Sequence, residues 1–172
     1  MTDDDTHHED EAPRAPKPLS NNQKRKMRSA SRLYAVQALY QMEVGEQGLD
    51  RVRAEFLNHR FGMTTEEGDE FVDGDIDLFS NVLQEAVNWQ AKVDQMTDRA
   101  LVAKWPIARI DPVLRALFRA AGAEFVATET PPKVVIVEYV DVAAAFFPEG
   151  KESKFVNAVL DHMAREARPE AF

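Results

Sequence analysis

Seven basic residues lie between Pro13 and Met42, and this stretch contains no Asp or Glu. The whole chain is acidic, with a formal net charge of -9, so these cations form a positive strip in an otherwise negative field. A strip of this kind attracts a polyanion that the rest of the chain repels. Its members are Arg14, Lys17, Lys24, Arg25, Lys26, Arg28 and Arg32.

A second group near the end of the chain has the residue types that bind unpaired nucleic acid. Lys151 and Lys154 are three positions apart, which makes them neighbours on a helix surface, and Phe155 follows at once. An aromatic ring beside two ammonium groups offers a platform for an unpaired base while the phosphates are neutralised. The alternative interpretation is that Phe155 belongs to the core and that both lysines are simply solvated.

Signals for enzyme chemistry are weak in the sequence. We find no Gly-rich phosphate loop, no histidine pair at metal spacing and no nucleophile elbow. The carboxylates between Glu66 and Asp77 lack the ordered spacing of a calcium loop, and His7 and His8 lie in an acidic leader. A metal-dependent enzyme that uses this acidic segment is a third-ranked alternative, and we predict no catalytic activity, no metal and no cofactor.

The elements that position these groups follow from hydrophobic spacing. Apolar residues recur at helical intervals in a first helix, where the basic strip runs into Leu33, Val36 and Leu39, and in several later segments. Asp111 followed by Pro112 is a strong helix start, because the carboxylate accepts free amide protons. The predicted helices cover 22–46, 49–60, one long stretch from 72 to 93 with a short extension towards 102, 111–125 and 151–166.

The segment from Val134 to Val140 is rich in β-branched residues, and on propensity alone it would be a strand. The apolar pattern continues to Phe146 without a turn signal, which is too long for an ordinary strand isolated among helices. A buried helix is therefore favoured. The resulting prediction is an all-α fold of about seven helices.

Composition divides the chain into three parts. Residues 1–22 combine an acidic block with three closely spaced prolines, so we expect a disordered leader before a helical domain at 23–168 and a tail at 169–172. The chain has no cysteine, which fits a reducing compartment, and no apolar stretch long enough for a signal peptide or membrane span. These features favour a cytoplasmic protein.

Three segments, in this order and at suitable distances, resemble the NusB family of bacterial transcription antitermination factors. They are RLYAVQALY at 32–40, PKVVIVE at 132–138 and KFVNAVLD at 154–161, of which the last is the most specific. The likeness covers roughly residues 24–166. NusB-like modules also occur fused to ribosomal RNA methyltransferases, but no catalytic domain follows in this chain.

The resemblance implies two perpendicular helical subbundles, pairing with the ribosomal protein NusE, and binding of boxA RNA from ribosomal RNA transcripts within the RNA polymerase antitermination complex. The family's RNA contacts map here onto Lys24, Arg28 and Arg32 at the first helix, and onto Lys154, Phe155 and Asn157 near the end. Charge adds Arg25 and Lys151 to this RNA-binding set. The family's NusE-facing tyrosine maps onto Tyr40.

The chain departs from the family pattern at several positions, with Val137 where Asn is usual, Ala158 where Gly is usual, Ala123-Glu124-Phe125 in place of Tyr-Glu-Leu, and Lys151 where relatives can be acidic. Other readings stay open. A module that binds only proteins would use the basic strip to hold an acidic partner, and a homodimer is a further alternative because some family members pair over the RNA surface. The acidic residues of the leader also suggest a hypothesis in which residues 3–11 fold back onto the basic strip.

Overall fold

The computed structural model describes residues 18–61, 74–101 and 105–172. This part of the chain contains seven α-helices, two short 3-10 turns and no strand, which confirms the predicted all-α class. The elements are α1 (Asn21–Val44), α2 (Leu49–His59), α3 (Ile76–Asn88), α4 (Gln90–Ala100), η1 (Ile107–Arg109), α5 (Pro112–Ala127), α6 (Pro132–Phe146), α7 (Ser153–Ala167) and η2 (Pro169–Ala171).

The segment with strand-like composition is the helix α6. Pro131 occupies its N-cap and Pro132 its first turn, where the missing amide proton is not needed. Val135, Ile136 and Tyr139 form the buried face, and Val142 and Ala143 continue it. Helical spacing of apolar residues therefore outweighs β-branched propensity here, as predicted.

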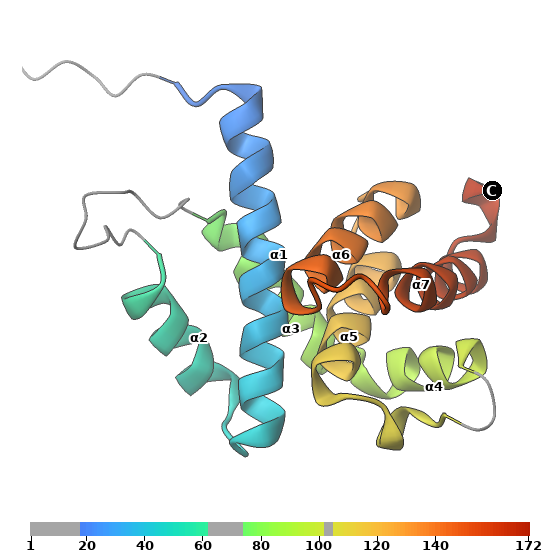
Figure 1. Cartoon of the computed structure of the whole chain (residues 1–172). Helices are drawn as coiled ribbons and strands as arrows, with labels where there is room; N and C mark the ends of the chain where they lie inside the picture. Colours follow the sequence, from blue (N-terminus) through green and yellow to red (C-terminus); the bar gives the residue numbers. More distant parts are fainter. Residues whose placement is uncertain (1–17, 62–73, 102–104) are drawn as a thin grey trace, which may run out of the picture.

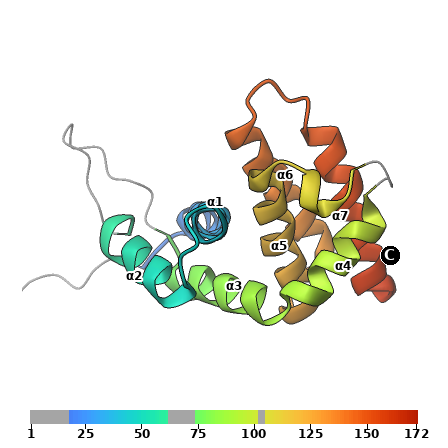
Figure 2. The same ribbon diagram turned by 90° about the horizontal axis from the view of Figure 1, so that it is seen from below.

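The long helix α1 forms the spine of one half of the molecule. It packs against α2 and α3 on one side and against α5 and α6 on the other. In Figure 1 it stands upright, whereas α4 and α7 lie across the view in the other half. Seen from below in Figure 2, α1 is viewed almost along its axis, and α3 leads from its side towards α4.

The predicted continuous helix from 72 to 93 is wrong in one respect, because the chain breaks at Trp89 between α3 and α4. Trp89 leaves helical geometry with φ -109° and ψ 12°, and its indole N–H donates to Glu85 at 2.8 Å. The break redirects the chain. Both helices contact α5, but α3 otherwise contacts α1 and α2 whereas α4 contacts α7, so the corner transfers the chain between the two halves. Val72 lies outside the described residues.

The central element of the core is α5, which contacts helices of both halves. Asp111 caps its start by accepting the Val113 N–H at 2.7 Å, as the sequence predicted. Ten residues of α5 are buried, among them Glu124. Gly122 lies so close to α4 that a Cβ atom would stand 2.3 Å from Val93 Cγ1, so a hydrogen side chain is required there.

Candidate nucleic-acid interface

Four exposed cations cover the start of α1, and we refer to them as the α1 cluster: Lys24, Arg25, Lys26 and Arg28. A capping box begins this helix, in which Ser20 Oγ accepts the Gln23 N–H at 3.1 Å and Gln23 Oε1 accepts the Ser20 N–H at 2.8 Å. No acidic residue lies in the first turn. Because the amino end of a helix is already positive, these cations add to the dipole field rather than offset it. The cluster therefore suits an anionic ligand.

Arg32 does not belong to this surface. Its guanidinium is buried and holds Glu124 of α5 through two parallel hydrogen bonds, each 2.9 Å long. Only 4% of the Arg32 side chain and none of the Glu124 side chain is exposed. This burial does not favour the predicted RNA contact of Arg32, because the guanidinium is enclosed and its charge is paired with Glu124 inside the protein.

Glu138 of α6 connects this ion pair to a third helix. Glu138 lies 3.7 Å from Arg32 Nη1, and its carboxylate accepts the Ser29 hydroxyl at 2.9 Å. Burial alone would lower the pKa of Arg32, but the hydrogen bonds and charge of Glu124 outweigh it and raise that pKa. Burial and the nearby Glu124 charge raise the pKa of Tyr139 well above its usual value. Arg32 thus holds α1, α5 and α6 together.

The second predicted group lies at the start of α7, and we call it the α7 cluster: Lys151, Lys154, Phe155 and Asn157. Lys154 and Asn157 are exposed on the helix, and Lys151 is exposed in the turn that follows Gly150, whose φ of 74° suits glycine. Lys151 lies 3.8 Å from Glu149, an exposed pair that leaves its charge only partly offset. Cations therefore flank this helix start as well.

Phe155 satisfies both interpretations of its role. Its ring packs edge-on against Phe118 of the core, with centroids 6.2 Å apart, and the side chain is only half-buried. The core therefore fixes the ring while part of it stays accessible at the surface. A fixed, partly open aromatic ring loses little entropy when a base packs on it.

The two clusters lie on different helices, and both α5 and α6 pack between α1 and α7. Because α6 contacts both of these helices, its exposed face offers one path between the clusters. This face carries Val137, which is 60% exposed, so the departure from Asn places an apolar side chain at the surface. Ala158 is exposed on α7 next to Asn157.

Tyr40 lies on a separate surface near the other end of α1. It is 37% exposed and stands at the edge of a groove of about 570 Å³ where α1, α2, α5 and α6 meet. Gln37, Gln41, Val44, Gly45, Phe56, Arg60, Val113 and Phe146 complete the lining. Apolar residues with a tyrosine and a few polar groups at the rim are typical of a protein-binding surface.

No metal centre is present in the part of the chain that the structure describes, since no three His, Asp or Glu side chains gather there. Asp75 instead caps α3 by accepting the Leu78 N–H at 3.0 Å, and its own carbonyl accepts the Ser31 hydroxyl at 2.7 Å. Residues 62–73, which include most of the acidic segment weighed as a cation site, lie outside the described ranges. Within those same ranges, no helix is long and apolar enough to cross a bilayer.

Comparison with known proteins gives concordant matches. The model of the NusB family matches residues 29–165. The transcription antitermination protein NusB of Maricaulis maris is 45% identical over 159 residues, covering 92% of this chain and 98% of that protein. The protein of the same name from Agrobacterium fabrum is 42% identical over 160 residues, covering 92% and 93% of the two chains.

Solved structures with the same fold are also found. NusB from T. maritima aligns with a TM-score of 0.64 and 26% identity, covering 84% of this chain and 95% of that one. A chain from a crystal structure of the antitermination factors NusB and NusE in complex with dsRNA aligns with a TM-score of 0.65 over 80% of this chain and 96% of that one. Its identity of 20% supports the fold alone.

Proposed function

The chain belongs to the NusB family, and from this premise we propose that it is a transcription antitermination factor that binds boxA-type RNA together with NusE. In this role it supports processive transcription of ribosomal RNA as part of the cytoplasmic RNA polymerase antitermination complex, and it performs no catalysis. The observation that carries the proposal is the α1 cluster, four exposed cations on a helix amino end in a chain of net charge -9.

The RNA we propose is single-stranded where it meets the protein. Phosphates lie against the α1 cluster and against Lys151 and Lys154, and an unpaired base packs near Phe155 with Asn157 beside it. Base-paired RNA hides the faces that an aromatic ring contacts. The half-buried ring of Phe155 therefore favours a single strand.

The partner surface we propose is the groove beside Tyr40. NusE would cover this surface while the RNA occupies the basic ends of α1 and α7, so one protein joins both partners without overlap. Tyr40→Asp places a charge at the edge of an apolar contact. We expect it to weaken NusE binding at least tenfold in calorimetry while RNA binding by the chain alone stays unchanged.

Salt dependence tests the RNA proposal. Four to six phosphate contacts on a single strand predict that affinity falls by about 50- to 300-fold between 50 and 200 mM salt, from a slope of about -0.7 per contact. The measurement is fluorescence anisotropy of labelled boxA RNA with and without NusE. A flat response refutes the electrostatic interface.

Variants assign the contacts. Replacing Arg28 and Lys154 by Ala removes two contacts and should reduce the salt slope by about 1.4. The matched control is Arg109→Ala, which removes an exposed cation from η1, an element that belongs to neither cluster, and should leave the slope unchanged. If the chain binds NusE but no RNA under either condition, it is a module that binds only proteins through its basic strip.

A further inference from the structure

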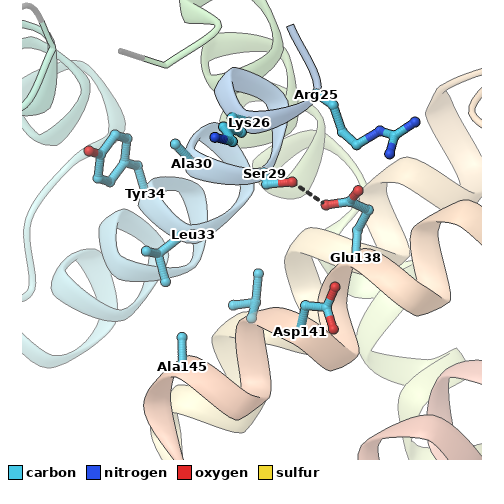
Figure 3. A pocket seen from close by; sticks show the side chains of 10 residues that line it. Arg25, Lys26, Ser29, Ala30, Leu33, Tyr34, Glu138, Asp141 and Ala145 are labelled. Atoms are coloured by element: carbon cyan, nitrogen blue, oxygen red, sulfur yellow. Dashed lines mark hydrogen bonds between the residues drawn. The ribbon is translucent and has the colours of Figure 1, made fainter. Parts of the chain in front are cut away.

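A groove of about 490 Å³ lies between the first half of α1 and the outer face of α6. Figure 3 shows Ser29 of α1 hydrogen-bonded to Glu138 of α6, with Arg25 above them, and Leu33 on α1 and Asp141 and Ala145 on α6 below them. The lining residues are Arg25, Lys26, Ser29, Ala30, Leu33, Tyr34, Glu138, Asp141, Val142 and Ala145. None of the predicted site residues except Arg25 lies in it.

The groove combines three chemical features in one place. Its surface is largely apolar, from Leu33, Val142 and two alanines, and Arg25 and Lys26 of the α1 cluster stand at one edge. Two carboxylates stand opposite on α6. Glu138 is held by the Ser29 hydroxyl at 2.9 Å and by Arg32 at 3.7 Å, so it is an oriented acceptor. Asp141, one turn further along, is exposed and open to an incoming donor.

This arrangement fits a nucleobase better than a phosphate. The carboxylates repel phosphate but accept hydrogen bonds from the exocyclic amino group of cytosine, adenine or guanine. Uracil offers only its N3–H to a carboxylate on this edge, and the carbonyl oxygens on either side of that donor would be repelled. The apolar walls contact the flat faces of a base, and the neighbouring cations keep its phosphates at the edge of the groove. A volume of about 490 Å³ admits a base with its sugar.

We propose that the groove between α1 and α6 holds one unstacked base of the bound single-stranded RNA and selects an amino-bearing base through Asp141 and Glu138. This inference rests on the proposed RNA-binding function and extends it from phosphate attraction to sequence selection. The groove also adjoins the α1 cluster, because Arg25 and Lys26 of that cluster line it.

The test uses the full chain and a panel of labelled boxA RNAs in which each amino-bearing nucleotide is replaced in turn by uridine. One replacement should weaken binding to the wild-type chain by about 5- to 150-fold through lost contacts in the groove. In Asp141→Asn this ratio should fall towards one, because an amide both donates and accepts, while the salt slope changes little. The matched control is Asp50→Asn, which removes an exposed negative charge from α2 and should preserve the ratio.

Outcomes separate this inference from the proposed function. If Asp141→Asn retains the wild-type ratio, the groove does not read the base, although the salt-dependent binding through Arg28 and Lys154 stands. If the variant loses affinity for NusE and keeps its base selection, the groove holds a protein segment and the inference is wrong. Absence of any RNA binding by the wild-type chain refutes both.

Discussion

Replacing Arg32 by Ala should lower the free energy of unfolding of the protein and leave its affinity for RNA unchanged. The substitution removes the partner of a carboxylate that has no exposed surface, and both bonds between Arg32 and Glu124 are lost. Breaking a buried ion pair by removing one member leaves an uncompensated charge, which costs about 3–5 kcal/mol. Total stabilities of domains are about 5–15 kcal/mol, so the variant still folds but with a much smaller margin.

Urea unfolding followed by circular dichroism measures this loss. With a denaturant dependence of about 2 kcal/mol per molar urea, the midpoint should fall by about 1.5–2.5 M. Arg28→Ala is the matched control, because Arg28 is exposed one turn earlier on the same helix, and its free energy of unfolding should change by less than about 0.5 kcal/mol. The double substitution Arg32→Met with Glu124→Leu removes both charges and should recover most of the stability.

RNA binding then distinguishes the two roles of arginine on α1. In buffer without urea, where Arg32→Ala is folded, its affinity for boxA RNA should match that of the wild type, whereas Arg28→Ala should bind more weakly. The reasoning fails if Arg32→Ala keeps its unfolding free energy within about 1 kcal/mol of the wild type and still loses RNA affinity. That result would mean that Arg32 leaves Glu124 and reaches the RNA.

Three further predictions concern packing, the leader and alkaline stability. Gly122→Ala should lower stability by about 1–3 kcal/mol in thermal unfolding, because the new methyl group meets Val93, and Val93→Ala should restore part of it; an unchanged melting temperature contradicts this close contact. Deleting residues 1–12 removes an acidic block tethered to the α1 cluster and should raise affinity for non-specific RNA, whereas equal affinity of the two chains would exclude competition by the leader. Tyr139→Phe should keep or slightly raise stability at pH 7, since the buried hydroxyl makes no hydrogen bond. The fold raises the pKa of Tyr139, so the neutral side chain contributes to the free energy of unfolding below the unfolded pKa of about 10, and this contribution is lost as pH rises through the folded pKa. Tyr139→Phe should therefore lose less stability than the wild type at high pH. An equal alkaline loss in both proteins would contradict this.

Helical periodicity predicted the fold well because burial enforces it. In α6 the spacing of Val135, Tyr139 and Val142 overrode β-branched propensity, since these residues must share one buried face. The break at Trp89 could not be seen in the same way. Val82, Ala86 and Val93 keep helical intervals across the break, and all three are buried. The apolar spacing therefore looks like that of one continuous helix, although the chain turns a corner at Trp89.

The ion pair of Arg32 carried a signal that charge counting ignored. Arg32 precedes Ala35, Val36 and Leu39 on the buried stripe of α1, and Glu124 stands among Ala121 and Phe125 on the most buried helix. A charged residue at a core position needs a partner, and two of opposite sign supply each other. The groove is different, because Glu138 and Asp141 gain their relation to α1 only through tertiary packing.

The amino end of α1 extends beyond the core that stabilises the rest of the helix. Residues 21–26 are all exposed, so the Ser20 and Gln23 capping box holds these turns without help from buried side chains. Segments of this kind open locally with a free energy far below that of global unfolding, and their amide protons exchange early. A polyanion that bridges Lys24 and Arg28 binds the closed turns and suppresses their opening. If RNA binds at this end of α1 as proposed, it would stabilise turns that no buried side chain holds in place.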